Sequence, residues 1–169
     1  KIMNLEFPYW ILHLSSMINI IQLHLVYIID CQPDINAEHF AIRTSAGLTD
    51  MTGIHKVFLS GIEAFEFLSH TVTRDLSTIK PGNAVYTVLL NNVGKVIDDA
   101  IVFYLDDQAK TSFKAEWLIC LGAGLGLEYI QKQARKQNLN IHHDENIVCL
   151  LFQGPRASTI ILPLLTFLD

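Results

Sequence analysis

Residues 84–103 read AVYTVLLNNVGKVIDDAIVF, and this stretch decides the fold. Two apolar runs flank the turn-forming residues Asn91-Asn92-Val93-Gly94, so the pattern predicts a β-hairpin. The first strand is expected over residues 84–90 and the returning strand over residues 96–105. Apolar side chains on both faces of the returning strand indicate a sheet that is covered on both sides.

Two adjacent aspartates, Asp98 and Asp99, interrupt the returning strand. Because side chains alternate along a strand, at least one carboxylate enters an apolar layer. A buried charge is retained only where protein groups satisfy it or a ligand uses it. An even-length hairpin loop places Tyr86 directly opposite Asp99 on one face, where the two would orient a cationic or aminopterin-like ligand. The alternative is an aspartate satisfied by that tyrosine or by backbone amides of an adjoining turn.

Outward from the hairpin, short apolar runs alternate with turn residues, which predicts an α+β fold. Ser60 followed by Glu63 is a capping-box pattern at the start of a helix expected over residues 61–72. The apolar stripe of that helix consists of Ile62, Phe65, Leu68 and Val72. Further strands are expected over residues 54–59, 116–121 and 147–152, and a second helix over residues 125–137.

The composition is that of a globular chain on the apolar side. Of the 169 residues, 50% are hydrophobic and 17% are charged. The 12 Lys and Arg against 17 Asp and Glu give a net charge of −5, so no basic field is available to bind nucleic acid. Cys31, Cys120 and Cys149 show no metal-ligand spacing and are interpreted as buried thiols of a reducing compartment.

Residues 7–29 contain no charged residue, over a length typical of a membrane-spanning helix, but polar residues interrupt the run. Three interpretations stay open: a buried helix or strand pair, a membrane anchor, and a segment foreign to the domain. Residues 1–30 are therefore treated as an atypical apolar segment that precedes a domain over residues 31–169. That domain is expected to be cut short, because its last apolar run stops at Asp169 without a cap or polar tail.

Two other patterns suggest chemistry less strongly. Residues 142–145, HHDE, are similar to a metal cluster, but consecutive side chains point different ways, and the segment is interpreted as a polar turn. The glycine-rich run over residues 122–126 lacks the spacing of a dinucleotide-binding motif. No metal site is predicted.

A set of short motifs runs in order along most of residues 35–160. They are Glu38-His39-Phe40-Ala41-Ile42-Arg43, Ser45-Ala46-Gly47-Leu48-Thr49-Asp50, Val72-Thr73-Arg74-Asp75, Lys80-Pro81-Gly82, Tyr86, Gly94-Lys95-Val96-Ile97-Asp98-Asp99 and Gln153-Gly154-Pro155. In order and spacing this set resembles the glycine cleavage T-protein (aminomethyltransferase) family. The resemblance implies a cloverleaf of antiparallel sheets with packed helices that binds tetrahydrofolate in a central channel. Only the first portion of that fold is expected here.

The resemblance also implies roles for three residues. Asp99 falls on the aspartate credited with the active site, and Tyr86 falls on the tyrosine near the folate pteridine. Ile101 falls on the apolar contact two residues beyond that aspartate. The implied reaction transfers the one-carbon unit of an aminomethyl group from the lipoyl arm of H-protein to tetrahydrofolate, with release of ammonia. Lipoylated H-protein and folate are the implied partners, in the bacterial cytoplasm or the mitochondrial matrix.

Departures from the family pattern leave the one-carbon donor open. The family's usual Val-Asn-Ala strand end is here replaced by residues 120–126, CLGAGLG, so an asparagine that would help to hold folate is missing. The glycine-rich version resembles T-protein-like paralogues, some of which are folate-dependent demethylases. The alternatives are therefore a demethylase or methyltransferase paralogue, a non-catalytic folate-binding protein of the iron–sulfur assembly type, and a truncated, inactive gene product.

Overall fold

The computed structural model describes residues 27–29, 35–122, 124–135 and 137–165. These residues divide into two compact units, one formed by residues 54–147 and the other by residues 27–53 together with 148–165. Most of the atypical apolar segment predicted over residues 1–30 lies outside the described residues. Within the described ranges, no helix is both long and apolar enough to cross a bilayer.

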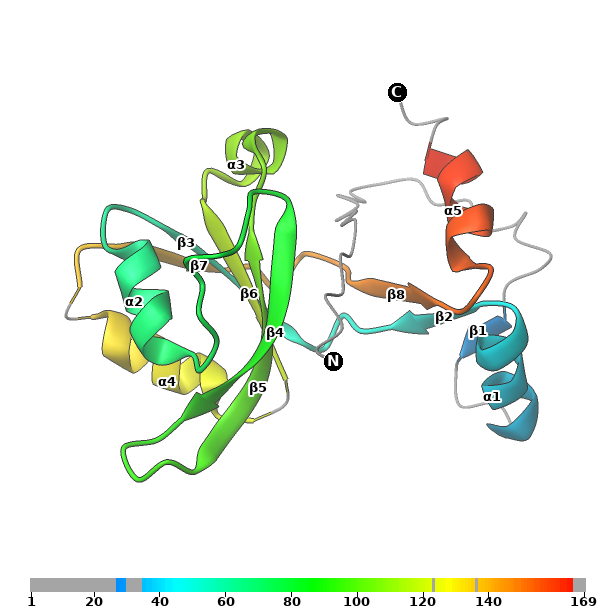
Figure 1. Ribbon diagram of the computed structural model, residues 1–169, viewed down its shortest axis with the longest axis horizontal. Coiled ribbons are helices and arrows are strands. Elements are labelled where there is room, and N and C mark those ends of the chain that lie inside the picture. Colours follow the sequence, from blue (N-terminus) through cyan, green and yellow to red (C-terminus); the bar gives the residue numbers. More distant parts are fainter. Residues whose placement is uncertain (1–26, 30–34, 123, 136, 166–169) are drawn as a thin grey trace. The chain divides into compact units, whose positions relative to one another are not determined.

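The first unit is built on a sheet of five strands in the order β4-β5-β6-β3-β7 (Figure 1). All neighbouring strands are antiparallel. The strands are β3 His55–Ser60, β4 Asn83–Leu90, β5 Val96–Tyr104, β6 Trp117–Leu121 and β7 Asn140–His143. The predicted α+β fold with antiparallel sheets and packed helices is confirmed, and the predicted hairpin is the β4–β5 pair.

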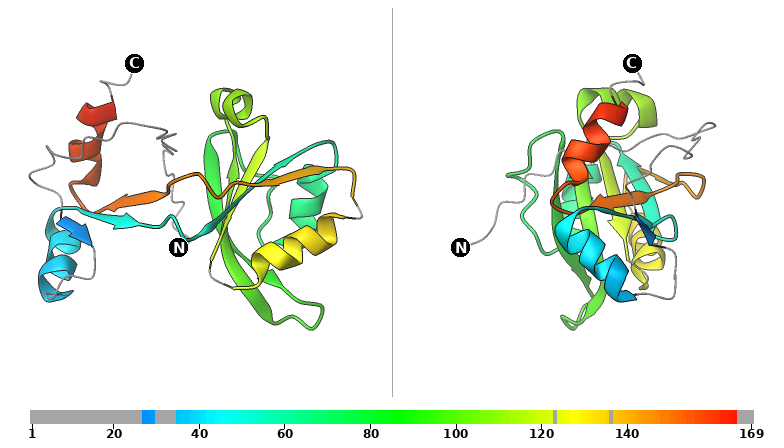
Figure 2. Two further views of the ribbon diagram at one scale, coloured as in Figure 1. Left: turned by 180° about the vertical axis from the view of Figure 1, so that it is seen from behind. Right: turned by 90° about the vertical axis from the view of Figure 1, so that its right-hand side faces the viewer.

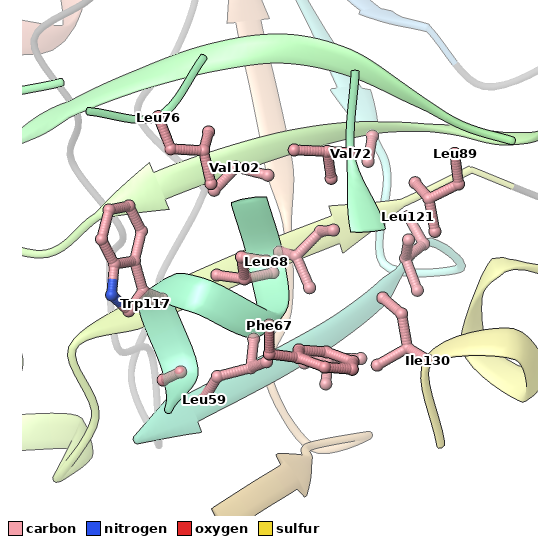
Figure 3. Packing of buried hydrophobic residues seen from close by; sticks show 14 residues of the cluster. Leu59, Phe67, Leu68, Val72, Leu76, Leu89, Val102, Trp117, Leu121 and Ile130 are labelled. Atoms are coloured by element: carbon pink, nitrogen blue, oxygen red, sulfur yellow. The ribbon is translucent and has the colours of Figure 1, made fainter. Parts of the chain in front are cut away.

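One face of this sheet carries the main core. Helices α2, Ala64–Thr71, and α4, Gly126–Ala134, pack on it. Figure 3 shows Phe67 and Leu68 of α2 among Leu59 and Val102 of the sheet, with Ile130 of α4 beside them. Each of these large apolar side chains is buried, and burial of one stabilises the fold by about 1.5–3 kcal/mol.

Helix α2 begins three residues later than the capping-box pattern predicts. Its N-cap is Glu63, which makes no capping hydrogen bond; the Glu63 carboxylate instead accepts the backbone N–H of Asn138 at 2.7 Å. The buried stripe shifts accordingly. Leu68 is fully buried, whereas Ile62 is 87% exposed and Phe65 is 43% exposed.

A smaller apolar cluster lies on the opposite face, beneath helix α3, Asp107–Phe113. Its buried members are Phe58, Leu105, Ala115, Leu118 and Cys120. Helix α3 was not predicted, although Asp106 caps it by accepting the N–H of Ala109 at 2.9 Å. Cys120 is buried as predicted, Cys149 is half-buried, and Cys31 lies outside the described residues.

The second unit joins segments from both sides of the first in sequence. Strand β2, Gly47–Asp50, pairs with β1, Tyr27–Ile29, in parallel and with β8, Leu150–Gln153, antiparallel (Figure 2). Helices α1, Ile35–Thr44, and α5, Ala157–Leu165, complete it. The parallel β1–β2 pair is the one exception, among the described strands, to the antiparallel pairing that we predicted.

Between β8 and α5, the backbone of Gly154 presses against the end of α1. Its backbone φ of +134° lies in a region that residues other than glycine rarely adopt. A Cβ at this position would lie 2.5 Å from the carbonyl oxygen of Ser45 and 2.7 Å from Cα of Ala46. The Gly-Pro pair at 154–155 therefore marks a close approach of two backbone segments.

Candidate functional site

The β4–β5 hairpin places the two aspartates on opposite faces of the sheet. Asp98 is 5% exposed and alternates with Ala100 and Val102, which belong to the main core. Asp99 is exposed and shares the other face with Ile101, which is 40% exposed. The prediction that at least one carboxylate enters an apolar layer is confirmed, and the buried carboxylate is that of Asp98.

Tyr86 and Asp99 meet on the exposed face without being directly opposite. The Tyr86 hydroxyl donates a hydrogen bond of 3.0 Å to Oδ2 of Asp99. In the observed register Tyr86 lies opposite Ile101, and Val88 lies opposite Asp99. The predicted direct pairing is wrong by two residues. The predicted shared face is confirmed, because diagonal neighbours on one face are within reach of a long side chain.

The turn between the strands contributes to this register error. Asn91 receives a hydrogen bond from the backbone N–H of Lys95 on its side-chain Oδ1, at 3.0 Å, and its own N–H donates to the Lys95 carbonyl at 2.9 Å. Gly94 adopts a φ of +78° within this loop, which glycine does at little cost. The loop therefore includes Lys95 and is one residue longer than its turn-forming residues suggest.

A β-bulge next to the turn accounts for the remaining one-residue shift in register. Leu90 pairs with Val96, but the preceding residue Leu89 pairs with Asp98, so Ile97 is an extra residue in β5. A strand pattern of period two carries no signal for an inserted residue. Bulges of this kind re-aim side chains, and this one brings Asp99 opposite Val88.

The Asp99 carboxylate also shifts the pKa of Tyr86. Its hydrogen bond with the phenol and its negative charge both raise the pKa of Tyr86 above the ordinary value of 10.0. A phenol is neutral at ordinary pH in any case, and this shift keeps Tyr86 a hydrogen-bond donor to a still higher pH. Tyr86 is 61% exposed, so an exposed carboxylate, an exposed phenol and the aliphatic side chain of Ile101 share one surface.

The cross-strand neighbours of Ile101 on β6 and β3, which lie in the same row of the sheet, are buried. Ile101 pairs with Cys120 of β6, and Cys120 pairs with Lys56 of β3. Cys120 is 9% exposed and Lys56 is 4% exposed. Within this row, the surface open to a ligand is thus the end formed by β4 and β5.

The buried carboxylate of Asp98 fastens helix α4 to the hairpin. Its Oδ2 accepts the N–H of Gly126, the first residue of α4, at 3.0 Å, and its Oδ1 accepts the N–H of Asp99 at 2.9 Å. Leu125, which precedes the helix, supplies no side-chain cap. Asp98 therefore provides both the acceptor and the negative charge that a helix N-terminus favours. Backbone amides thus satisfy Asp98, whereas the aspartate that we considered as satisfied by Tyr86 is Asp99, which accepts the Tyr86 hydroxyl.

Glycines leave the room that Asp98 occupies. A Cβ at Gly126 would lie 2.6 Å from Oδ2 of Asp98, and one at Gly124 would lie 2.9 Å from its Cγ. A Cβ at Gly122 would lie 2.7 Å from its Oδ1. Sequence reasoning considered this run as a dinucleotide motif and as a feature of T-protein-like paralogues, and it missed the space that these glycines leave for Asp98. The available signal was alternate glycines directly after a strand, together with an aspartate in need of backbone donors.

The histidines of residues 142–145 do not converge on one point. His142 Nε2 lies 3.6 Å from Asp144, and His143 Nδ1 lies 3.7 Å from Glu145. Both histidines end strand β7, so the polar turn predicted from residue 142 begins only after His143. Across the part of the chain that the structure describes, no three His, Cys, Asp or Glu side chains are grouped closely enough to hold a metal ion.

A hollow of about 370 Å³ lies between α2 and α4, on the sheet face opposite Asp99. Its lining residues are Glu66, Phe67, His70, Thr71, Tyr129, Gln133 and Gln137. None of the three residues predicted for the site contributes to it. The structure brings Tyr86, Asp99 and Ile101 together on the exposed face instead.

The order of motifs along the chain agrees with one known family. Residues 16–168 match the family model of the GCVT N-terminal domain. The chain belongs to this family. The resemblance to the N-terminal portion of the T-protein family is thereby confirmed, and Tyr86, Asp99 and Ile101 lie on the β4–β5 hairpin of this GCVT N-terminal domain.

The similar proteins include aminomethyltransferases and a subunit of an N-demethylase. An aminomethyltransferase of Desulforamulus reducens is 34% identical over 131 residues, which cover 75% of this chain and 34% of that protein. The gamma subunit of a heme-dependent oxidative N-demethylase of Ectopseudomonas mendocina is 37% identical over 124 residues, covering 73% of this chain and 31% of that protein. The chain thus spans about a third of the length of these curated relatives.

A solved structure shares the fold of this GCVT N-terminal domain. The crystal structure of glycine cleavage system aminomethyltransferase T from Bartonella henselae superposes with a TM-score of 0.64 at 27% sequence identity. The match covers 75% of this chain and 34% of that one. The mixed helix and sheet architecture is therefore that of the corresponding portion of an aminomethyltransferase.

Proposed function

We propose that this domain provides the folate-facing carboxylate of a tetrahydrofolate-dependent aminomethyltransferase, with Asp99 as its catalytic residue. The observation that carries the proposal is the hydrogen bond from Tyr86 to Asp99 on an exposed face beside Ile101. Relatives named aminomethyltransferase support the reaction class. The reaction moves the one-carbon unit of an aminomethyl group from the lipoyl arm of H-protein to tetrahydrofolate and releases ammonia.

The three side chains fit the chemistry of a reduced pterin. Such a ring has N–H donors at its edge and an apolar face. An ionised Asp99 is an acceptor only, and Ile101 offers aliphatic surface to the ring. When bound, tetrahydrofolate supplies the nitrogen atoms that receive the one-carbon unit.

In this mechanism the domain contributes charge and orientation. The Asp99 carboxylate stabilises positive charge that develops at the transferred carbon, which is most effective when the carboxylate is held in place beforehand. Tyr86 holds it by donating to Oδ2, and the raised pKa of Tyr86 keeps that donor protonated. Ile101 helps to align the ring by contact.

Binding of 5-formyltetrahydrofolate to the 169-residue chain, measured by isothermal titration calorimetry, tests the folate part of the proposal. We expect saturable binding that is weakened by Asp99→Asn and by Tyr86→Phe. Asp107→Asn is the matched control, because the Asp107 side chain is fully exposed at the start of α3. A folded chain that binds no folate would contradict the proposal for this chain.

Release of ammonia from aminomethyl-lipoyl H-protein tests the catalytic part. If Asp99 stabilises developing charge, Asp99→Ala lowers turnover by about a hundredfold or more. Loss of turnover with retained folate affinity favours chemistry at Asp99. Loss of affinity alone points to the non-catalytic folate-binding alternative.

The second candidate is a folate-dependent demethylase paralogue. The observation that favours it is the 37% identity to the N-demethylase gamma subunit. The candidates differ in the one-carbon donor, so ammonia release from aminomethyl H-protein separates them. A chain that binds folate, releases no ammonia and accepts a one-carbon unit derived from an N-methyl amine would favour the demethylase.

A further inference from the structure

Gly122 lies directly beside the Asp99 carboxylate, one residue after the end of β6. Its backbone N–H donates a hydrogen bond of 3.0 Å to the carbonyl of Asp99. A Cβ added to Gly122 would overlap Oδ1 of Asp99. The Asp99 carboxylate therefore fills the space that a side chain at position 122 would need.

We propose that Gly122 is a positioning residue of the site, because its missing side chain lets the Asp99 carboxylate lie between the end of β6 and the hydroxyl of Tyr86. With any larger residue at this position, Asp99 would have to turn away from Tyr86. The effect on ligand binding rests on the proposed folate function. In that function, Gly122 determines the position of the Asp99 carboxylate relative to the bound pterin.

The neighbouring glycines show why position 122 is special. A Cβ at Gly124 would lie 2.6 Å from the carbonyl oxygen of Ile97, which is backbone, and one at Gly126 would lie 2.9 Å from Cδ2 of the buried Leu121. These conflicts strain the fold. At Gly122 the close atoms belong to two carboxylates, and Asp99 is exposed and able to rotate.

The backbone of Gly122 also suits other residues. Its φ lies outside the left-handed range, unlike those of Gly61, Gly82, Gly94 and Gly154. Gly122→Ala therefore displaces the exposed carboxylate of Asp99, which breaks the hydrogen bond to Tyr86, and it also crowds Oδ1 of the buried Asp98. Gly53→Ala is the matched control, because a Cβ at Gly53 would meet nothing within 4 Å.

The test is a pH titration of the Tyr86 ring by NMR, with ¹³C-labelled tyrosine and assignment from Tyr86→Phe. We expect the pKa of Tyr86 to fall in Gly122→Ala to the value found in Asp99→Asn, and to be unchanged in Gly53→Ala. An unchanged titration in a folded Gly122→Ala chain overturns the proposal. This readout requires no ligand, so it stands even if the proposed function fails.

Folate binding then tests the consequence for the ligand. The dissociation constant of 5-formyltetrahydrofolate is expected to rise about tenfold in Gly122→Ala, the loss typical of one misplaced charge-assisted contact, and to stay unchanged in Gly53→Ala. A shifted Tyr86 titration with unchanged folate affinity would overturn the ligand role of Gly122. Absence of binding by the unsubstituted chain would instead contradict the proposed function.

A double variant keeps the proposal testable if Gly122→Ala is poorly folded. In an Asp99→Ala background, the methyl group introduced by Gly122→Ala no longer meets the carboxylate of Asp99. The loss of melting temperature caused by Gly122→Ala should therefore be smaller in that background. An equal loss in both backgrounds would assign the conflict to Asp98 and overturn the proposal.

Discussion

The hydroxyl of Tyr86 on β4 reaches diagonally across the hairpin to Asp99 on β5, two residues from the Ile101 that Tyr86 directly opposes. This contact exists in only one strand register. A slip of one residue would turn one of the two side chains to the other face of the sheet. The bulge at Ile97 thus helps to determine which phenol and which carboxylate can meet.

Stability at alkaline pH should report this contact. The folded-state pKa of Tyr86 is raised by the hydrogen bond to Asp99 and by its charge, so the unfolded chain loses this proton first as pH rises. The stabilisation is complete below pH 10.0, the ordinary value, and is lost as pH rises through the folded-state pKa. We expect the free energy of unfolding to fall less steeply above that pH in Tyr86→Phe than in the unsubstituted chain, as measured by urea denaturation.

Asp99→Asn provides the control for that experiment. Because the same carboxylate causes the shift, the alkaline loss of stability should shrink equally in Asp99→Asn and in the double variant with Tyr86→Phe. Additive effects of the two substitutions would show that Asp99 is not the origin of the shift.

The two adjacent aspartates should respond in opposite ways to the same substitution. Asp98→Asn places an amide N–H₂ against either Gly126 N–H or Asp99 N–H, so we expect it to lower the free energy of unfolding by about 1–3 kcal/mol. Asp99→Asn, on the exposed face, should change it by less than about 0.5 kcal/mol. Urea denaturation followed by tryptophan fluorescence measures both. Equal losses would mean that Asp98 does not hold α4 to the hairpin.

Helix α2 offers a direct comparison between the sequence pattern and the structure. Both Ile62 and Leu68 belong to the predicted apolar stripe, but Leu68 is fully buried and Ile62 is 87% exposed. Leu68→Ala should therefore cost about 2–5 kcal/mol of stability. Ile62→Ala should change stability by less than about 0.5 kcal/mol. Thermal unfolding of the two variants measures both losses of stability. Similar losses in the two variants would favour a helix that begins at residue 61, as the sequence pattern predicts.

The close approach at Gly154 predicts a strong local effect. Gly154→Ala forces an unfavourable φ and a contact with backbone atoms of Ser45 and Ala46, so we expect a loss of about 2–4 kcal/mol in the second unit. Hydrogen exchange of the β2 and β8 amides should accelerate. Gly53→Ala, which meets no neighbouring atom, should leave exchange in these strands unchanged. Unchanged protection in Gly154→Ala would contradict the described approach.

Much of the fold could be predicted from local patterns, and the errors have physical causes. The hairpin was correct because its turn residues and apolar runs are close in sequence. The start of α2 was wrong because Glu63 bonds to Asn138, which lies far along the chain. The strand at residues 140–143 was missed because its pairing with β3 depends on tertiary contacts.

In the candidate site, too, local patterns predicted some features correctly and missed those that depend on distant contacts. Alternation along β5 placed Asp98 and Asp99 on opposite faces, and it placed Ile101 with Asp99. The register of Tyr86 was wrong because the bulge at Ile97 leaves no trace in a period-two pattern. The backbone partner of Asp98 was missed: the alternate glycines after β6 were a signal, but Gly126 is distant in sequence and approaches Asp98 only in the folded sheet.

The pairing of β2 with β8 has a consequence for the order of folding. Residues 51–149 separate the two strands in sequence, so β2 lacks the antiparallel partner that the structure describes until these residues and β8 have been synthesised. The β4–β5 hairpin closes through a short loop and can form earlier, whereas contacts between distant segments form slowly. A substitution that slows folding of the first unit would thus delay completion of the second without altering any residue in it.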